Sequence, residues 1–66
     1  MELMNVYYVD PATGREGHTI LPSATKVDGT FEHKGQRWRI TRATKSTRHD
    51  AVVDLKVRPT TPNEEN

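Results

Sequence analysis

The stretch that decides the fold is Thr30–Arg48, with the sequence Thr-Phe-Glu-His-Lys-Gly-Gln-Arg-Trp-Arg-Ile-Thr-Arg-Ala-Thr-Lys-Ser-Thr-Arg. If Lys34-Gly35 forms a two-residue turn, Phe31 faces Trp38 across a β-hairpin and Glu32 faces Arg37. One face of the hairpin then carries an aromatic pair and the other an ion pair, and such cross-strand pairs contribute about 0.2–1 kcal/mol each. Register, aromatic pairing and charge pairing agree, so the sequence predicts a β-hairpin here.

The second strand of this hairpin continues past the tryptophan with the same alternation. Trp38 and Ile40 point to the core, whereas Arg37 and Arg39 point away from it. The pattern would turn Arg42 inward, so either the strand reaches the rim of the sheet at this point or a β-bulge reverses its faces.

The last apolar stretch, residues 51–57, also alternates, with Ala, Val, Leu and Val at the inward positions. Pairing it with the preceding strand so that Ile40 meets Val53 also places Trp38 opposite Leu55. This register leaves residues 45–48 as a four-residue loop.

The N-terminal third of the chain predicts a second hairpin. Leu3–Val9 is rich in β-branched and aromatic residues and apolar on both faces, which is typical of a central or covered strand. Residues 10–17 read as a loop, and a short strand over residues 18–21 follows. Asp28-Gly29 predicts a further tight turn, pairing Val27 with Thr30 after a short extended segment.

These elements predict an all-β fold, a small antiparallel meander of four to six strands that forms an SH3-like or OB-like half-barrel. We expect a single domain over residues 1–58. Residues 59–66 contain two prolines and no apolar side chain of any size, so they predict a disordered C-terminal tail.

Composition limits the classes of protein that fit. The chain has 66 residues, 32% of them hydrophobic, and no cysteine, which excludes disulfides and cysteine-ligated zinc as stabilising devices. Because the core is small, burial of further apolar surface against a protein partner or in a homo-oligomer is possible. Neither an apolar run of spanning length nor a signal-like N-terminus is present, so we expect a cytoplasmic protein with no membrane contact.

Positive charge gathers on the decisive stretch, although the net charge of the whole chain is only +1. Six Lys/Arg and no Asp or Glu occur between Lys34 and His49. Such a stripe on a small sheet suits contact with nucleic-acid phosphates. The alternative is a solvated face that only provides solubility. The predicted nucleic-acid-binding residues are Lys34, Arg37, Arg39, Arg42, Lys45 and Arg48, with Lys56 and Arg58 on the neighbouring strand.

The competing prediction is a protein–protein adaptor or assembly component. Its interface would use the apolar strand Leu3–Val9 or the loop of residues 10–17. The residues assigned to it are Met4, Val6, Tyr8 and Arg15.

Enzyme chemistry is not indicated. His18, His33 and His49 lack the spacing of a metal-ligand pair, and the aspartates lie at positions typical of turns and loops. A barrel of this size has little room for a substrate pocket. We therefore expect no catalytic residue, metal site, cofactor or small-molecule substrate.

The run Gly29–Ile40 resembles the hairpins of small bacterial β-barrel domains, and its Gly-x-x-Trp-x-Ile spacing is similar to that of phage head–tail connector and accessory proteins. The resemblance implies a bacterial or phage accessory protein. It assigns a function to no residue.

Overall fold

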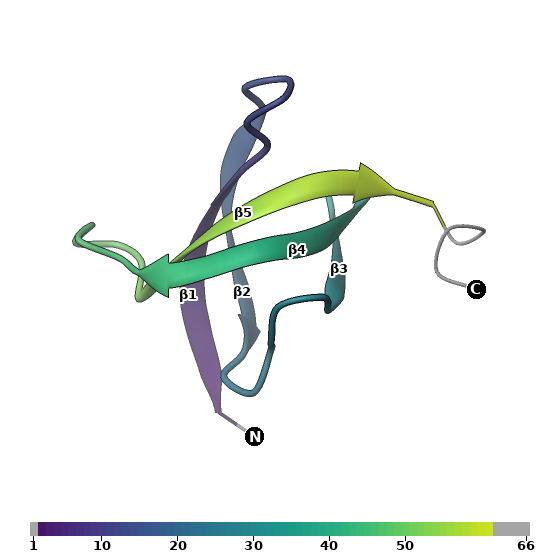
Figure 1. Cartoon of the computed structure of the whole chain (residues 1–66). Coiled ribbons are helices and arrows are strands. Elements are labelled where there is room, and N and C mark those ends of the chain that lie inside the picture. Colours follow the sequence, from purple (N-terminus) through teal and green to yellow (C-terminus); the bar gives the residue numbers. More distant parts are fainter. Residues whose placement is uncertain (1, 62–66) are drawn as a thin grey trace.

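The computed structural model describes residues 2–61 and shows a single five-stranded sheet over that range. The strands are β1 (Leu3–Val9), β2 (Glu16–Pro22), β3 (Thr30–His33), β4 (Gln36–Lys45) and β5 (Val53–Thr60). Their order in the sheet is β2-β1-β5-β4-β3, and the sheet curls so that the β4–β5 hairpin crosses in front of the β1–β2 hairpin (Figure 1). The prediction of an all-β, barrel-like fold is confirmed. Among the described residues, no helical segment has the length and apolar character that crossing a bilayer requires.

The sheet departs from a pure meander at one place, because its first and last strands are neighbours. β1 runs parallel to β5, with Val6 opposite Val53 and Tyr8 opposite Leu55. The other three pairings are antiparallel. β1 therefore lies between β2 and β5 with both edges paired, and the free edges of the sheet belong to β2 and β3.

The β3–β4 hairpin forms in the predicted register. Phe31 pairs with Trp38 and Glu32 pairs with Arg37. Lys34 and Gly35 both have positive φ, 54° and 77°, as a type I′ turn requires. Lysine takes this conformation at some cost, and the two cross-strand pairs on either side offset it.

The predicted register between the last two strands is wrong by four residues. Ile40 pairs with Val57 and Trp38 with Pro59, instead of with Val53 and Leu55. Up to Ile40 the shift is even and keeps each side chain on its predicted face, so hydrophobic alternation could not distinguish the two registers there. β4 continues to Lys45, and the loop to β5 covers residues 46–52 instead of 45–48.

A β-bulge interrupts β4 after Ile40. This is one of the two alternatives that the sequence predicted for the position of Arg42. The register shifts between Ile40 and Arg42, and the hydroxyl of Thr41 donates a hydrogen bond to the carbonyl of Lys56 at 3.0 Å. The extra residue reverses the alternation, so Arg42 turns away from the core.

The Asp28-Gly29 hairpin is not formed, which corrects that prediction. The amide of Gly29 donates to the carbonyl of Lys26 at 3.0 Å, and Asp28 has a φ of 74° inside this turn. Two further backbone hydrogen bonds of 2.9 Å join Asp28 and Gly29 to Ile40, so the segment extends the β3–β4 ladder instead of pairing Val27 with Thr30.

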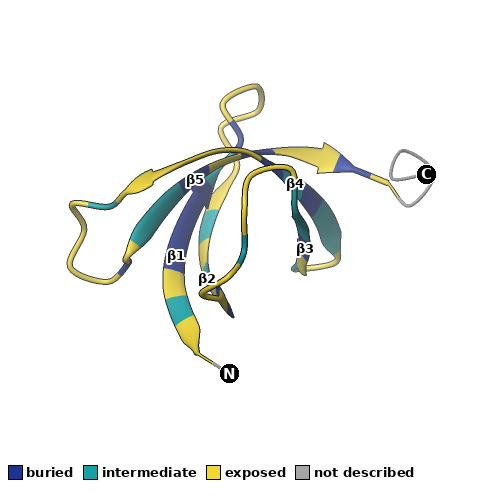
Figure 2. Cartoon of the chain, turned by 60° about the horizontal axis from the view of Figure 1, so that its bottom comes forward, coloured by how far each residue is buried: buried dark blue, intermediate teal, exposed yellow. Residues whose placement is uncertain are grey.

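The core lies on the concave side of the curled sheet, where buried segments of the strands meet and loop tips remain exposed (Figure 2). Tyr8 is central to it, with ring centroids 5.4 Å from Phe31 and 5.5 Å from Trp38. The guanidinium carbon of Arg15 lies 5.0 Å from the centroid of Trp38, so the loop between β1 and β2 contributes to this packing. The buried apolar cluster comprises Val6, Tyr8, Leu21, Phe31, Trp38, Ile40, Leu55 and Val57.

β5 extends into the segment predicted as a tail. Pro59 pairs with Trp38, and Thr60 is 3% exposed. The pairing of β1 with β5 ends at Lys56, so the end of β5 pairs with β4 alone, and a proline is tolerated where one side of a strand is open. The remainder of the predicted tail, residues 62–66, lies outside the described residues.

Candidate nucleic-acid interface

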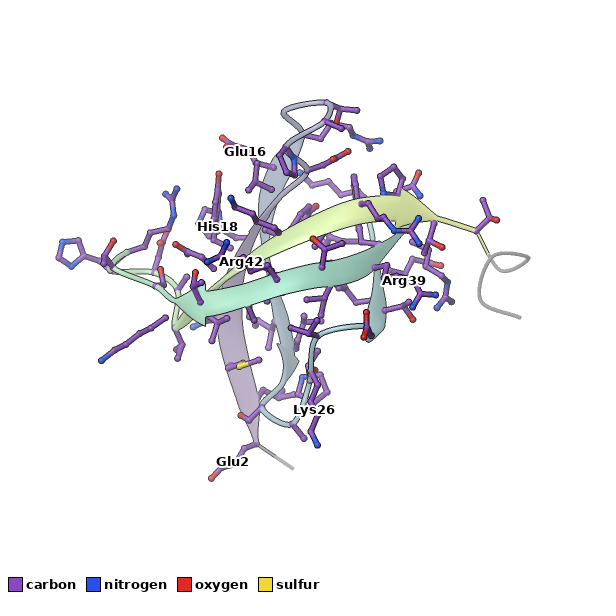
Figure 3. All side chains as sticks on the ribbon, in the orientation of Figure 1. Glu2, Glu16, His18, Lys26, Arg39 and Arg42 are labelled. Carbon is purple, nitrogen blue, oxygen red and sulfur yellow. The ribbon has the colours of Figure 1, made fainter. Side chains whose placement is uncertain are left out.

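The outer face of β4 and β5 carries two adjacent rows of paired cations. Arg39 lies opposite Arg58, and Arg42 lies opposite Lys56. The β-bulge creates the second row, because without it Arg42 would share a face with Ile40. Figure 3 shows Arg39 and Arg42 along β4. We call these four residues the basic face.

Two like-charged rows are an unfavourable arrangement for a small fold. Like charges directly opposite one another on neighbouring strands destabilise a sheet, by amounts comparable to the ~0.2–1 kcal/mol that favourable pairs contribute. Arg42, Lys56 and Arg58 are exposed, so solvent screens much of this repulsion. Folded sheets usually avoid like charges directly opposite one another. Two neighbouring rows of such pairs are therefore typical of a functional surface.

The arginines at the β3 end of β4 are held in place. Nη1 of Arg39 donates to the carbonyl of Asp28 at 3.0 Å, and Nη1 of Arg37 lies 3.4 Å from the hydroxyl of Thr30. Nε of Arg39 is buried and has no hydrogen-bond partner within residues 2–61. Both side chains are half-buried, so the protein fixes part of the basic face before any ligand arrives.

The remaining predicted nucleic-acid residues lie beside the basic face or are engaged elsewhere. Lys34 is exposed at the β3–β4 turn. Lys45 lies opposite Val53 at the far end of β4, so it shares the face of an inward residue. Arg48 folds over β1, where its guanidinium carbon is 3.7 Å from the centroid of the Tyr7 ring.

Arg48 belongs to a second cluster, on the outer face of β1 and β2. Its Nε lies 3.8 Å from Oδ1 of Asp54, and Nε2 of His18 lies 3.3 Å from Oδ2 of Asp50. The rings of Tyr7 and His18 are 5.2 Å apart. These contacts tie the loop of residues 46–52 to the first two strands.

The hydroxyl of Tyr7 donates a hydrogen bond to the carboxylate of Glu16 on β2. This hydrogen bond, together with burial and the negative charge of Glu16, raises the pKa of Tyr7. Arg48 acts in the opposite direction because a cation favours the phenolate. Burial also raises the pKa of Tyr8, on the other face of the strand.

The residues assigned to the alternative protein interface mostly serve the barrel. Val6 and Tyr8 are buried in the core, and Met4 packs against it. β1 pairs with β2 along its whole length and with β5 from Val6 to Val9, so its backbone is engaged on both sides over that part of the strand. Arg15 is exposed, although its guanidinium lies over Trp38.

Two of the histidines and Asp10 have structural contacts. His33 shares a 2.6 Å hydrogen bond with the hydroxyl of Tyr8, and His18 pairs with Asp50 as described. His49 is exposed in the β4–β5 loop. Asp10 is 1% exposed and accepts hydrogen bonds from the amide of Ala12 and the hydroxyl of Thr13. Within residues 2–61, no three potential ligands come close enough together to hold a metal ion.

The sequence indicated the bases of the interface but not how they pair. In the predicted register Lys56 would have lain opposite Arg37, five residues from its observed partner Arg42. The polar segment after Lys45 is long enough for a longer loop, and its length is the sequence feature that could have indicated the observed register of β4 on β5. Comparison with protein-family models, with curated proteins and with solved structures found no match to this chain.

Proposed function

We propose that the basic face on β4 and β5 binds the phosphate backbone of nucleic acid. The observation that carries the proposal is the pair of adjacent cation rows, Arg39 with Arg58 and Arg42 with Lys56. Their mutual repulsion falls when anions lie between them, so a phosphate backbone gains from an arrangement that costs the free protein stability.

The mechanism is electrostatic and independent of base sequence. Each phosphate neutralised by a Lys or Arg releases a condensed counterion, so the affinity falls as salt concentration rises. Four cations in contact with duplex DNA give a slope of about −3 to −4 in a plot of log affinity against log salt concentration. The partly buried, hydrogen-bonded Arg39 reduces the entropy lost on binding.

The test is a titration of labelled duplex and single-stranded DNA and RNA at several salt concentrations. Arg42→Gln and Lys56→Gln should each weaken binding for all sequences and reduce the magnitude of the salt slope by about 1. Lys26→Gln is the matched control, because Lys26 is an exposed lysine in the β2–β3 loop and not part of the basic face (Figure 3).

Lys56→Gln also separates lost binding from lost folding. Removing one member of a like-charged row should leave the melting temperature unchanged or raise it. No binding at about 50 mM salt, or a salt slope that the two substitutions leave unchanged, would reject the proposal. The phage or bacterial accessory role implied by the Gly29–Ile40 resemblance stays a prediction, with nucleic-acid binding as one activity compatible with it.

A further inference from the structure

The two ends of the sheet leave a hollow between them. Among the described residues, 2–61, β2 pairs only with β1 and β3 pairs only with β4, so each has one free edge. A hollow of about 410 Å³ lies where these edges diverge, lined by Asn5, His18, Thr19, Ile20 and His33. We call this region the seam; Figures 1 and 2 show β2 and β3 as separate strands that do not lie side by side in the sheet.

One side-chain bridge crosses the seam in place of a backbone ladder. Tyr8 projects from β1 past Gly17 of β2, and its hydroxyl is 2.6 Å from Nδ1 of His33 on β3. Gly17 makes this path possible, because a Cβ at that position would lie 2.7 Å from the tyrosine oxygen. Beyond this bridge, β2 and β3 share no backbone hydrogen bond within residues 2–61.

Between its ends, Glu16 and Pro22, the free edge of β2 lacks the devices that normally protect such edges. Natural edge strands carry lysines, prolines, inward charges or bulges that prevent pairing with another chain. From Gly17 to Leu21 the only ionisable side chain is His18, and the sequence continues with Thr19 and an isoleucine that is 58% exposed. This run keeps a regular register with β1, so its outer edge is regular too.

We propose that the seam binds a single extended polypeptide segment, which pairs as a sixth strand with the free edge of β2 from His18 to Leu21, beside the bridge that Tyr8 and His33 form. This mode of recognition takes its affinity from main-chain hydrogen bonds and its specificity from alternate side chains. It is separate from the proposed nucleic-acid function, because the seam and the basic face lie on different strands.

The position of β3 favours an isolated extended segment as the ligand over the edge strand of another folded sheet. A folded sheet that added its edge strand to β2 would bring its own next strand into the space occupied by β3. An isolated extended segment has no such second strand. The five lining side chains carry no Asp, Glu, Lys or Arg, so the segment that fits is uncharged, with an apolar residue against Ile20.

The experiment is selection from a displayed library of linear peptides of about 10 residues, long enough for one strand. Immobilised wild-type protein is the target, and the Ile20→Lys variant is used for counter-selection. A synthetic peptide from the enriched set is then titrated into the labelled protein, followed by NMR and amide hydrogen exchange. Ile20→Lys places a protecting charge on the edge of β2. Val27→Lys is the matched control, since Val27 is also an exposed apolar residue but lies in the β2–β3 loop outside the lining of the seam.

We expect uncharged, alternating peptides to be enriched and to protect amides of β2. Ile20→Lys should weaken their binding by on the order of tenfold or more, whereas Val27→Lys should leave it unchanged. Arg42→Gln should also leave it unchanged, which separates this site from the basic face. The proposal would be overturned if no peptide bound the wild-type protein better than the Ile20→Lys variant. It would also be overturned if the bound peptide protected amides of other strands only. Sedimentation that shows a dimer sensitive to Ile20→Lys would also overturn it, by identifying a second copy as the occupant.

Discussion

The guanidinium of Arg48 stacks 3.7 Å from the centroid of the Tyr7 ring, and this contact holds the β4–β5 loop against the outer face of β1. Arg48 is one of the bases that the sequence assigned to nucleic-acid binding, yet its partners are an aromatic ring and the carboxylate of Asp54. The loop that it anchors precedes β5, so the contact bears on the register of the last two strands.

Arg48→Ala should lower the free energy of unfolding by about 0.5–1 kcal/mol, the usual size of a partly exposed cation–π contact. In a domain of this size the melting temperature should fall by roughly 2–8 °C, measured by thermal unfolding followed by circular dichroism. Arg42→Ala is the control, because Arg42 faces Lys56 across the ladder and its loss relieves repulsion. Equal destabilisation by both substitutions would contradict the structural role of Arg48.

Stability should fall as the pH rises above the ordinary pKa of tyrosine, near 10. The pKa of Tyr7 is raised in the folded protein, first by its hydrogen bond to Glu16 and then by burial. The folded state therefore holds the phenolic proton more tightly than the unfolded state. The resulting stability is fully present below the unfolded pKa and is lost as the pH rises through the raised folded pKa.

Denaturant unfolding at a series of pH values between about 8 and 11 measures this loss. Tyr7→Phe should make the decline of stability with pH shallower. It should not abolish the decline, because burial raises the pKa of Tyr8 as well. A decline of the same steepness in the Tyr7→Phe variant would show that Tyr7 does not contribute to it.

Gly17→Ala should destabilise the barrel by about 1–3 kcal/mol, the usual cost of overpacking. The new methyl group would lie 2.7 Å from the hydroxyl oxygen of Tyr8 and 2.9 Å from its ring carbon Cζ. Tyr8 cannot shift without losing its hydrogen bond to His33 or its packing against Phe31.

A double-mutant cycle with Tyr8→Phe identifies the cause of this effect. Removing the hydroxyl relieves the shortest contact and leaves the one to Cζ, so the two changes together should cost less than their sum. Gly14→Ala is the control: its Cβ meets nothing within 4 Å, and any cost arises from its φ of 76°. Strict additivity of Gly17→Ala with Tyr8→Phe would mean that the clash does not limit stability.

Asp10→Ala should unfold the β1–β2 loop locally and destabilise the protein by about 1.5–3 kcal/mol, because hydrogen bonds to a carboxylate are among the stronger ones. The carboxylate is buried and accepts from the amide of Ala12 at 3.1 Å and the hydroxyl of Thr13 at 2.8 Å. Asp10→Asn keeps one carbonyl acceptor, so it should retain more stability than the alanine variant. Faster amide exchange at Ala12 in Asp10→Ala, compared with wild type, would locate the effect. Unchanged exchange there would contradict it.

Local sequence signals were sufficient for the β3–β4 hairpin. Its turn residues, aromatic pair and ion pair all lie within eight residues of one another, so each choice reinforces the same register. The same signals failed at Asp28-Gly29, where the dipeptide has the composition of a tight hairpin turn. Its hydrogen bonds instead go to Ile40, a partner more than ten residues away.

The sequence by itself determined the all-β class, the hairpin Phe31–Trp38, the inward and outward faces of most strands, and the presence of a basic stretch. These follow from alternation with a period of two and from short-range pairing, which need no knowledge of distant contacts. The tertiary structure alone decided which bases share a face. The register of β4 on β5 depends on an even shift that alternation cannot detect, on the bulge after Ile40, and on a loop anchored by Arg48 over Tyr7. For the same reason, only the folded sheet shows that β1 lies beside β5 and that the free edges belong to β2 and β3.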